Sequence, residues 1–423
     1  MSSRPQWVIW IAVVYSGSAI CSAQDQREWS ESQIVERFLA LSPQAQELRA
    51  RLALTEAEAK TRTVYPNPAI SYSREGAGYN EFFEASQTLP LNGRIRYLRD
   101  AGSAAVSVAD ANREAALWSL RTDLRLAFYR MVAAQERLSL LSVSAGEVEQ
   151  LIGILRRREE EGEGSRYDRL RAEREAAELR TDLVAASALI AAAGARVNGF
   201  LPDGTQVQKV QGALPVPSEP PSLEELRARA VDSRADYRAE QKALARYKIE
   251  EQAARRLRIP EPQVSAGLKR ADVISGAEPN PFSNVTRTGV AFSLSVPLPV
   301  FNSGRYEVAR YQAEQEQATA RAAVLARQIQ TEIQGAREVL TIRREALAGY
   351  EGELESAGVE LTRITRVAYE EGEVGILELL DSLRVSRLAN LRLLELQAGV
   401  REAFIELERV VGAELTTNGG GRP

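Results

Sequence analysis

The chain has 423 residues, of which 44% are hydrophobic, enough to build sizeable cores. Its 54 basic and 58 acidic residues are intermixed and give a net charge of −4, so no basic patch indicates a nucleic-acid partner. The absence of histidine, with one cysteine and two methionines, removes the usual zinc, copper and haem ligands and the usual base of a catalytic triad. We therefore expect no cofactor and no metal site.

The first 23 residues have the pattern of a secretory signal peptide. An apolar run at 7–15 follows a basic residue, and small residues lead to Ala23, after which we expect cleavage. The run is shorter than the ~20 residues that a membrane-spanning helix needs, and we expect no later segment to span a membrane as a helix. Lipidation of Cys21 is the alternative, although Ile20 stands where a lipidation site has a small residue.

Three sequence markers then occur twice in the same order. YPNPAIS at 65–71 matches RIPEPQVS at 258–265, LPLNGR at 89–94 matches LPVFNSGR at 298–305, and EEEGEGSRYDRL at 159–170 matches YEEGEVGILELL at 369–380. Self-similarity of this kind is the signature of a repeated architecture. The chain is therefore expected to contain two copies of one structural unit.

Each copy begins with a helical stretch and continues into strands. The stretches at 30–63 and 222–258 run into proline pairs, which cannot continue a helix. Strands are expected at about 68–90 and 262–299, the second pair separated by a polar loop at 270–287. In the second copy, apolar residues at 290, 292, 294, 296 and 298 alternate with small or polar ones, which predicts a strand with one apolar face.

A long helix follows the strands of each copy. Leu117, Leu120, Leu124 and Ala127 begin a series that continues to Leu155 in steps of three and four, the 3.5-residue period of a coiled coil. A helix over 93–161 would be on the order of 100 Å long at ~1.5 Å per residue. The second copy repeats the period, with a break in the pattern at Arg343. A glycine-rich turn then leads into a shorter helix, at 165–197 or 376–415.

The predicted fold class is α+β, dominated by long α-helices, with a repeated order of helix, strand pair, long helix and helix. The two shorter helices of a copy, placed end to end, match the long one, so each copy predicts a two-ply helical rod with strands at one end. The first repeat spans 24–198, a linker rich in proline and glycine spans 199–221, and the second repeat spans 222–415. The polar tail at 416–423 is expected to be disordered.

Two strand pairs cannot close a barrel on their own, because the smallest transmembrane barrels use ~8 strands. Several copies together would close one, and their rods would continue it as a helical tube. A periplasmic coiled-coil protein with two small soluble hairpins is the alternative that the pattern leaves open.

The doubled order of NP strand entry, QTLPLNGR or SVPLPVFNSGR, long helix and YEEGEVGILELLDSLR resembles the TolC-type outer-membrane efflux proteins over about 30–415. The resemblance implies a homotrimer in outer-membrane lipid, with a twelve-stranded β-barrel continued into the periplasm by an α-helical coiled-coil barrel. It implies a passive exit duct, not an enzyme, that works with a periplasmic adaptor and an inner-membrane pump of the RND type. The chain looks similar to the metal-exporting cobalt-zinc-cadmium branch, but metal ions, drugs and polypeptides all remain open as cargo.

The resemblance also assigns roles to acidic residues. Family members carry carboxylates just after the glycine turn, at a periplasmic tip where three chains converge, and Glu378, Asp381 and Asp168 fall on those positions. Ringed carboxylates favour cations and repel one another, so protonation or a bound cation would bias opening of the pore. The structural alternative is that acids in the first turn of a helix suit the helix dipole and the solvent.

Further residues of the tip have simpler expected roles. Gly162 and Gly372 suit a sharp chain reversal, because glycine tolerates positive φ. Some relatives hold the tip closed with an arginine two residues after the glycine, but Val374 stands there, which puts such a latch in doubt. Arg157 and Arg158 stand close to glutamates at 160 and 161, which predicts either an ion-paired helix end or a contact with the adaptor.

Two other functions compete with the duct. A periplasmic adaptor or scaffold is the runner-up, but an adaptor would have one helical hairpin flanked by β-rich halves, and this sequence has two hairpins. A hydrolase that uses Glu378 and Asp381 as a carboxylate pair needs a folded cleft, which a long coiled coil offers little material to build.

Overall fold

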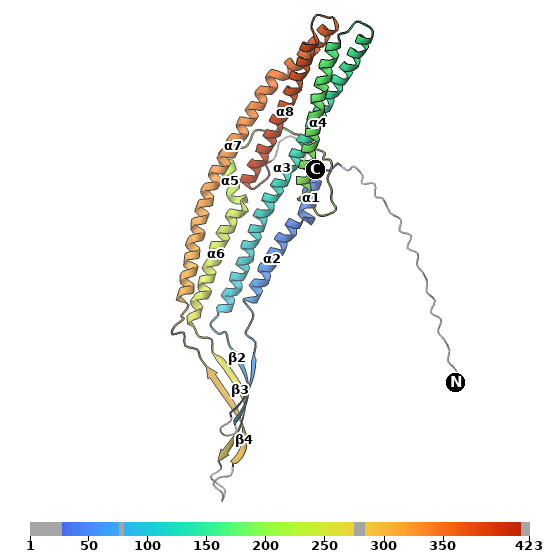
Figure 1. Cartoon of the computed structure of the whole chain (residues 1–423). Helices are drawn as coiled ribbons and strands as arrows, with labels where there is room; N and C mark the ends of the chain where they lie inside the picture. Colours follow the sequence, from blue (N-terminus) through green and yellow to red (C-terminus); the bar gives the residue numbers. More distant parts are fainter. Residues whose placement is uncertain (1–27, 76–79, 275–283, 416–423) are drawn as a thin grey trace, which may run out of the picture.

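The computed structural model describes residues 28–75, 80–274 and 284–415, which form an elongated rod with strands at one end and two helical hairpins at the other (Figure 1). The expected signal peptide, the alternative at Cys21 and the tail at 416–423 lie outside the described residues, as does part of the loop expected at 270–287. The elements follow in the order α1–α2–β1–β2–α3–α4 and then α5–α6–β3–β4–α7–α8, with a short helix η1 after α6. This order is the helix, strand pair, long helix and helix that the sequence predicts in each half.

The helical stretch expected at the start of each half consists of two separate helices. In the first half α1 (Glu31–Leu41) and α2 (Pro43–Thr61) are separated at Ser42, whose hydroxyl caps α2. In the second half α5 (Leu223–Ser233) and α6 (Ala235–Arg255), followed by η1 (Arg256–Arg258), are separated at Arg234. Ser30 and Ser222 each open their half with a capping box, so the two halves begin in the same way.

The long and short helices lie where the periodicity predicts them. α3 (Arg94–Glu160) and α7 (Arg305–Glu370) have 67 and 66 residues, and α4 (Arg166–Asn198) and α8 (Ile376–Val411) return along them. The break in the apolar pattern at Arg343 does not interrupt α7. The guanidinium of Arg343 instead donates a hydrogen bond of 2.6 Å to the Gly399 carbonyl of α8, which connects the two helices.

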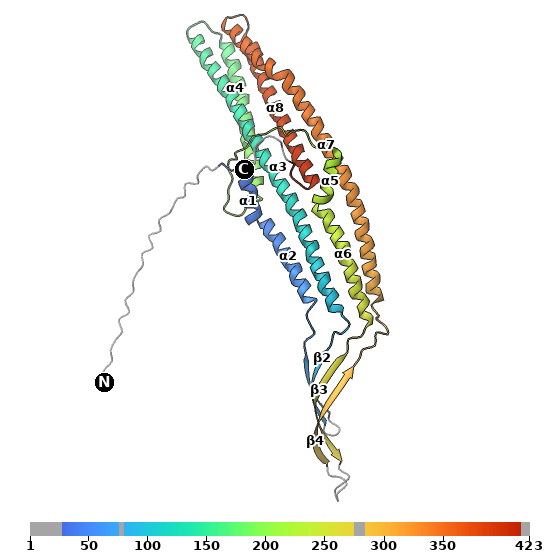
Figure 2. The ribbon, with the colours of Figure 1, turned by 180° about the vertical axis from the view of Figure 1, so that it is seen from behind.

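α3 is the central helix of the rod and packs against α2, α4, α6 and α8. One stretch of it is apolar and long enough to cross a membrane by length and composition alone, so the expectation that no later segment passes this test is wrong. Although α3 packs on four helices, only 28% of that stretch is buried within the chain. α3 lies between α2 and α6 in the rod (Figure 2). The core around its middle contains Ile34, Phe38, Phe128, Met131 and Ile405.

The four strands form one antiparallel sheet in the order β1-β2-β3-β4. They are β1 (Ala69–Glu75), β2 (Asn80–Thr88), β3 (Gln263–Ile274) and β4 (Asn284–Ser295). β3 and β4 extend into the region expected as a loop, whereas positions 296 and 298 of the predicted alternation lie beyond β4. The two strand pairs are joined through β2 and β3, which leaves β1 and β4 as the edges of the sheet.

Candidate functional site

One face of the sheet is apolar and uncovered. The strand register aligns Tyr72, Phe83, Leu268 and Val290 in one row across the sheet. The next row contains Ile70 and Phe292, whose side chains are 73% and 79% exposed. Monomeric soluble proteins rarely expose a contiguous apolar surface of this kind, so the face is expected to contact lipid or protein.

The opposite face is small and polar. Ser86, Ser265 and Ser293 lie in one row, and the Oγ atoms of Ser265 and Ser293 are 2.6 Å apart. Ser265 also donates to the carboxylate of Glu84. In the neighbouring row, a Cβ added to Gly267 would lie 2.3 Å from the Phe83 carbonyl oxygen, so this position requires glycine. Phe82 of β2 is an exception on this face, and the Lys269 ammonium lies 5.0 Å from its ring centroid. Apart from it, apolar and polar faces alternate along the strands, which is the pattern of a barrel wall.

The apolar face has polar or aromatic boundaries at both ends. A row of Arg74, Glu81, Arg270 and Thr288 follows the apolar rows toward the far end of the strands. Near the helices, the aromatic side chains of Tyr65, Phe301 and Tyr306 are exposed. Aromatic residues at the edge of an apolar band are typical of a membrane interface.

The two helical hairpins end in turns of the same geometry at the opposite end of the rod (Figure 1). Gly162 and Gly372 have φ angles of +80° and +79°, in the left-handed region that favours glycine. Gly162 N–H donates to the Glu159 carbonyl, and Gly372 N–H donates to the Tyr369 carbonyl, both at 3.1 Å. The turn residues of the two hairpins therefore correspond one to one.

The three predicted acids all lie at this end of the rod. Glu378 is in the first turn of α8, and its side chain folds back over the helix start, because a Cβ added to Gly375 would lie 2.9 Å from Glu378 Oε2. Asp381, three residues further along α8, is exposed. Asp168, in the first turn of α4, is half-buried and close to the other hairpin: burial raises the pKa of Tyr369, and the charge of Asp168 raises it further.

No family model matches the chain, and no curated protein does. Several solved structures match over nearly the whole chain. A CusC structure, described in terms of transmembrane channel formation, has a TM-score of 0.71 and 16% identity and covers 91% of this chain and 92% of its own. The chain has the fold of the TolC-type channels.

Two further structures extend this comparison. The CmeC outer-membrane channel of Campylobacter jejuni has a TM-score of 0.69 and 13% identity, covering 92% of this chain and 87% of its own. The open-state MtrE outer-membrane channel of Neisseria gonorrhoeae has a TM-score of 0.67 and 19% identity, covering 90% and 89%. The resemblance to TolC-type proteins that the sequence predicts is therefore confirmed for the fold.

Within this TolC-type fold, Arg169 of α4 forms two ion pairs at the tip of the first hairpin, and the sequence interpretation missed them. Its guanidinium lies 2.6 Å from Glu159 Oε2 and 2.7 Å from Glu173 Oε1, and its hydrogen bond lowers the pKa of the Glu159 carboxyl. The spacing of four residues between Arg169 and Glu173 was the available signal. Within the described tip residues, neither Arg157 nor Arg158 pairs with the glutamates at 160 and 161.

A buried polar network lies at mid-height of the TolC-type rod, and the sequence did not predict it. Arg125 of α3 contacts Glu31 of α1 and, at 2.6 Å, Glu408 of α8. The Tyr129 hydroxyl donates to Glu31 at 2.5 Å and accepts from Arg401 at 2.6 Å. These contacts join three helices from both halves of the chain.

The network sets the charge states of its members. Burial opposes ionisation of Glu31, but Arg125, Tyr129 and Arg401 together hold its pKa below the usual value. Burial and the hydrogen bond to Glu31 raise the pKa of Tyr129 to about 12. Burial raises the pKa of Glu408 even though Arg125 is adjacent, because this carboxyl is the more enclosed of the two.

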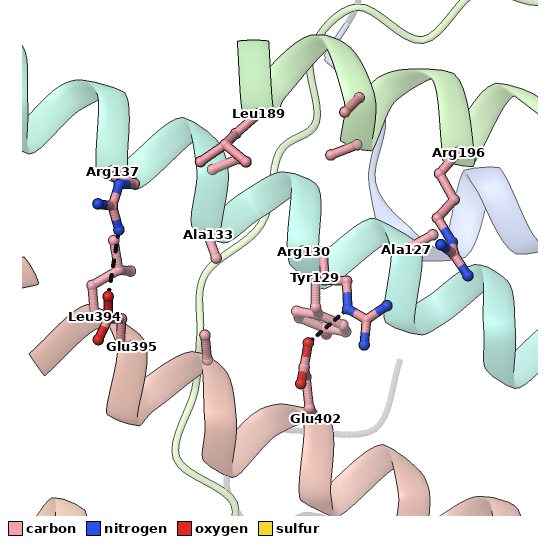
Figure 3. Close-up of a pocket in the computed structure, with 14 residues that line it drawn as sticks. Ala127, Tyr129, Arg130, Ala133, Arg137, Leu189, Arg196, Leu394, Glu395 and Glu402 are labelled. Carbon is pink, nitrogen blue, oxygen red and sulfur yellow. Dashed lines mark hydrogen bonds and ion pairs between the residues drawn. The ribbon is translucent and has the colours of Figure 1, made fainter. Parts of the chain in front are cut away.

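A cavity of about 430 Å³ lies between α3, α4 and α8 (Figure 3). Alanines form much of its wall, and two ion pairs cross it from α3 to α8: Arg130 to Glu402 at 2.8 Å and Arg137 to Glu395 at 3.4 Å. Arg196 of α4 lies at one end of it. Neither Glu378 nor Asp381 lines this cavity, so it gives no support to a carboxylate-pair hydrolase.

Proposed function

We propose that the chain is the outer-membrane exit duct of a tripartite efflux system, a passive channel and not an enzyme. The observation that carries the proposal is the four-stranded sheet with one apolar, exposed face and one small polar face. Three copies would supply twelve strands, above the ~8 of the smallest transmembrane barrels. The apolar face would meet lipid, the polar face would line the channel, and the helical rods would extend into the periplasm.

The homotrimer is supported by the edges of the rod as well as by the sheet. Val184 of α4 and Ile342 of α7 are 71% and 57% exposed, although both lie within helices, of 33 and 66 residues. Apolar residues on a helical face are buried by a neighbouring helix. Copies arranged side by side would cover these edges and close a helical tube.

A duplicated unit is supported by the equivalent positions of the two halves. Gly93 precedes α3 and Gly304 precedes α7, with φ angles of +71° and +78°, and the two tip turns share their hydrogen bonds. We propose an order of signal peptide at 1–23, first repeat at 24–198, linker at 199–221 and second repeat at 222–415.

We propose that Glu378, Asp381 and Asp168 form an acidic constriction where the tips of three copies converge. The placement of all three in the first two turns of α4 and α8, at one end of the rod, supports this. Carboxylates in such a ring would attract cations and repel one another. The folded-back side chain of Glu378 would have to swing outward to reach the axis.

The same tips would meet the periplasmic adaptor, which connects the duct to an inner-membrane pump of the RND type. The adaptor surface would include the turns at Gly162 and Gly372, with Arg157 and Arg158 beside the first turn. The side chain of Arg157 is exposed, and among the described tip residues it forms no ion pair with the glutamates at 160 and 161. Both observations support a contact between Arg157 and the adaptor. Metal ions, drugs and polypeptides remain options for the cargo, the metal-exporting branch among them.

Single-channel conductance in a planar bilayer tests this function. The purified wild-type protein is compared with the triple variant Asp168→Ala, Glu378→Ala, Asp381→Ala over a range of divalent-cation concentrations. The control is the triple variant Glu160→Ala, Glu161→Ala, Glu371→Ala, which removes the same number of negative charges from the tip. It distinguishes an effect of the proposed carboxylate ring from an effect of the overall charge of the tip. We expect discrete channels whose cation preference and divalent block are lost in the first variant only.

Two other outcomes test the acidic constriction and the duct separately. Channels with unchanged selectivity in both variants would keep the duct and reject the acidic constriction. Folded protein that gives no channels would reject the duct and favour the periplasmic scaffold.

A further inference from the structure

The two strand-to-helix junctions share a pattern of local hydrogen bonds, although the second has two more residues between its leucine and its glycine. Leu91 N–H donates to the Leu89 carbonyl at 2.8 Å in the first junction, and Val300 N–H donates to the Leu298 carbonyl at 2.9 Å in the second. In both, an asparagine side-chain oxygen accepts a backbone N–H two residues further on. The acceptors are Asn92 at 2.9 Å and Asn302 at 3.2 Å. The two turns are therefore alike but not identical, because Asn92 bonds the first residue of its helix and Asn302 bonds the residue before its helix.

The first junction is docked on the other half of the same chain. Leu89 N–H donates to the Pro262 carbonyl at 2.8 Å, which continues the β2–β3 ladder by one bond. The Asn92 amide nitrogen donates to Glu261 Oε1 at 2.8 Å, and Asn92 is only 4% exposed. The proline-flanked strand entry at 260–262 is thus the docking partner of this junction.

The apolar segment of the second junction is uncovered, although Gly304 at its end packs closely against Ala254 and Leu257. Leu298 and Val300 are 75% and 72% exposed, and Phe301 is 97% exposed. Among the described residues, the Leu298 N–H and the Asn302 amide nitrogen have no hydrogen-bond acceptor. Water can satisfy both donors at this exposed segment, so the uncovered apolar surface is the feature that indicates a partner.

The matching strand entry is on the far side of the sheet. Pro66 and Pro68 of the YPNP segment correspond to Pro260 and Pro262, and they lead into β1, whereas the second junction follows β4. β1 and β4 are opposite edges, about three strand spacings or roughly 14 Å apart. A second copy of the chain is therefore the partner that presents this entry next to β4.

We infer that the β4–α7 junction of one copy docks on residues 66–68 of the next copy. Leu298 N–H donates to the Pro68 carbonyl of the next copy, and the Asn302 amide donates to the side-chain oxygen of its Asn67. The first bond reproduces the one that Leu89 makes within the chain, and the second is the counterpart of the Asn92 bond from an asparagine one residue further along. The inference rests on the proposed homotrimer and specifies how its copies join.

The docking also fixes the register between copies. If Leu298 lies opposite Pro68 as Leu89 lies opposite Pro262, then Tyr72 lies opposite Leu294, and Ser71 lies opposite Ser295. Tyr72 and Leu294 belong to the apolar face of the sheet, and both serines belong to the polar face. A shift by one residue would place apolar side chains opposite polar ones, so this agreement between faces is an independent check on the inference.

Disulfide formation between copies tests the register. The pair Ser71→Cys with Ser295→Cys is compared with the pair Ser73→Cys with Ser295→Cys, which is displaced by two residues on the same face. Opposite edges of one sheet are beyond the 4.4–6.8 Å Cα separation that a disulfide spans, so a bond reports a neighbouring copy. Each single-cysteine variant is the control for crosslinks that do not join the two introduced positions.

We expect covalent dimers and trimers on a denaturing gel after oxidation of the first pair, and at least a tenfold smaller yield from the second. Crosslinking of the second pair alone, in protein that light scattering shows to be trimeric, would overturn the register and keep the channel. A wild-type protein that is monomeric in detergent would overturn the homotrimer and the docking together.

The asparagine contact has its own readout. Asn302→Ala should lower the temperature at which the trimer dissociates, whereas Ser303→Ala, in the same exposed segment, should leave it unchanged. Equal dissociation temperatures for wild type and both variants would overturn the contact to Asn67.

Discussion

Arg387 of α8 and Glu175 of α4 form an ion pair that joins the two helical hairpins. Both terminal nitrogens of the guanidinium lie 3.0 Å from Glu175 Oε1, and the two side chains are 9% and 14% exposed. The two hairpins also share an apolar cluster that contains Leu151, Leu155, Ala176, Leu179, Leu379 and Leu391. The ion pair and the cluster therefore hold the two tips of one chain together, and any opening of the proposed duct has to move them together or break this pair.

Removal of Arg387 should loosen the tips. Arg387→Ala leaves the Glu175 carboxylate mostly buried without a cation, and the loss of one partner of a buried pair costs on the order of 3 kcal/mol. Amide hydrogen exchange should become faster along α4 and α8 near the tip. Arg392→Ala is the control, because its pair with Glu395 is 61% and 53% exposed and contributes about 0–1 kcal/mol. Equal exchange in both variants would show that the apolar cluster alone holds the hairpins.

The network around Arg125 predicts a loss of stability in acid. The pKa of Glu31 is lower in the folded chain than in the unfolded chain, so its contribution is present above the unfolded value and is lost as pH falls through the folded value. In Glu31→Gln, the midpoint of urea unfolding should therefore fall less between pH 7 and pH 3 than in wild type. Glu36→Gln, at an exposed position of the same helix, should follow the wild-type curve. Parallel curves for all three proteins would remove Glu31 from the acid response.

Local patterns predicted most of the helices, because their signals are short in range. The 3.5-residue period identified α3, and Gly162 and Gly372 marked the reversals into α4 and α8. The split at Ser42 was missed since a serine followed by a proline reads equally as a helix end and as the cap of a new helix.

Long-range pairings were not predictable from the same patterns. Arg125 and Glu408 are separated by 283 residues, and each resembles an ordinary charge on a solvated helix face. The joining of β2 to β3 likewise depends on which strand edges meet, and Phe83 or Leu268 alone gives no sign of its partner. The acidic constriction proposed for Glu378 depends on the meeting of three chains, which no pattern within one chain records.

Gly267 should be essential for the sheet. Its added Cβ would lie 2.3 Å from the backbone oxygen of Phe83, and backbone atoms of a paired strand cannot move aside without breaking the ladder. Gly267→Ala should therefore strongly reduce the amount of folded, membrane-inserted protein. Gly289→Ala is a matched control on the same face of β4, where an added Cβ meets nothing within 4 Å. Similar yields of both variants would show that β2 and β3 do not pair as described.

The two faces of β4 give the sharpest test of membrane insertion. Phe292 belongs to the apolar face and is 79% exposed, while its neighbour Ser293 belongs to the polar face. If the sheet forms a barrel wall, Phe292→Arg places a charge in lipid, at a cost of about 2–4 kcal/mol near the bilayer midplane, whereas Ser293→Arg places it in water. We expect the first variant to be depleted from the outer-membrane fraction and the second to insert and to shift the ion selectivity of the channel. A soluble scaffold would respond in the opposite sense, because replacement of an exposed phenylalanine by arginine would improve its solubility, and normal recovery of Phe292→Arg from the soluble periplasmic fraction would reject the barrel.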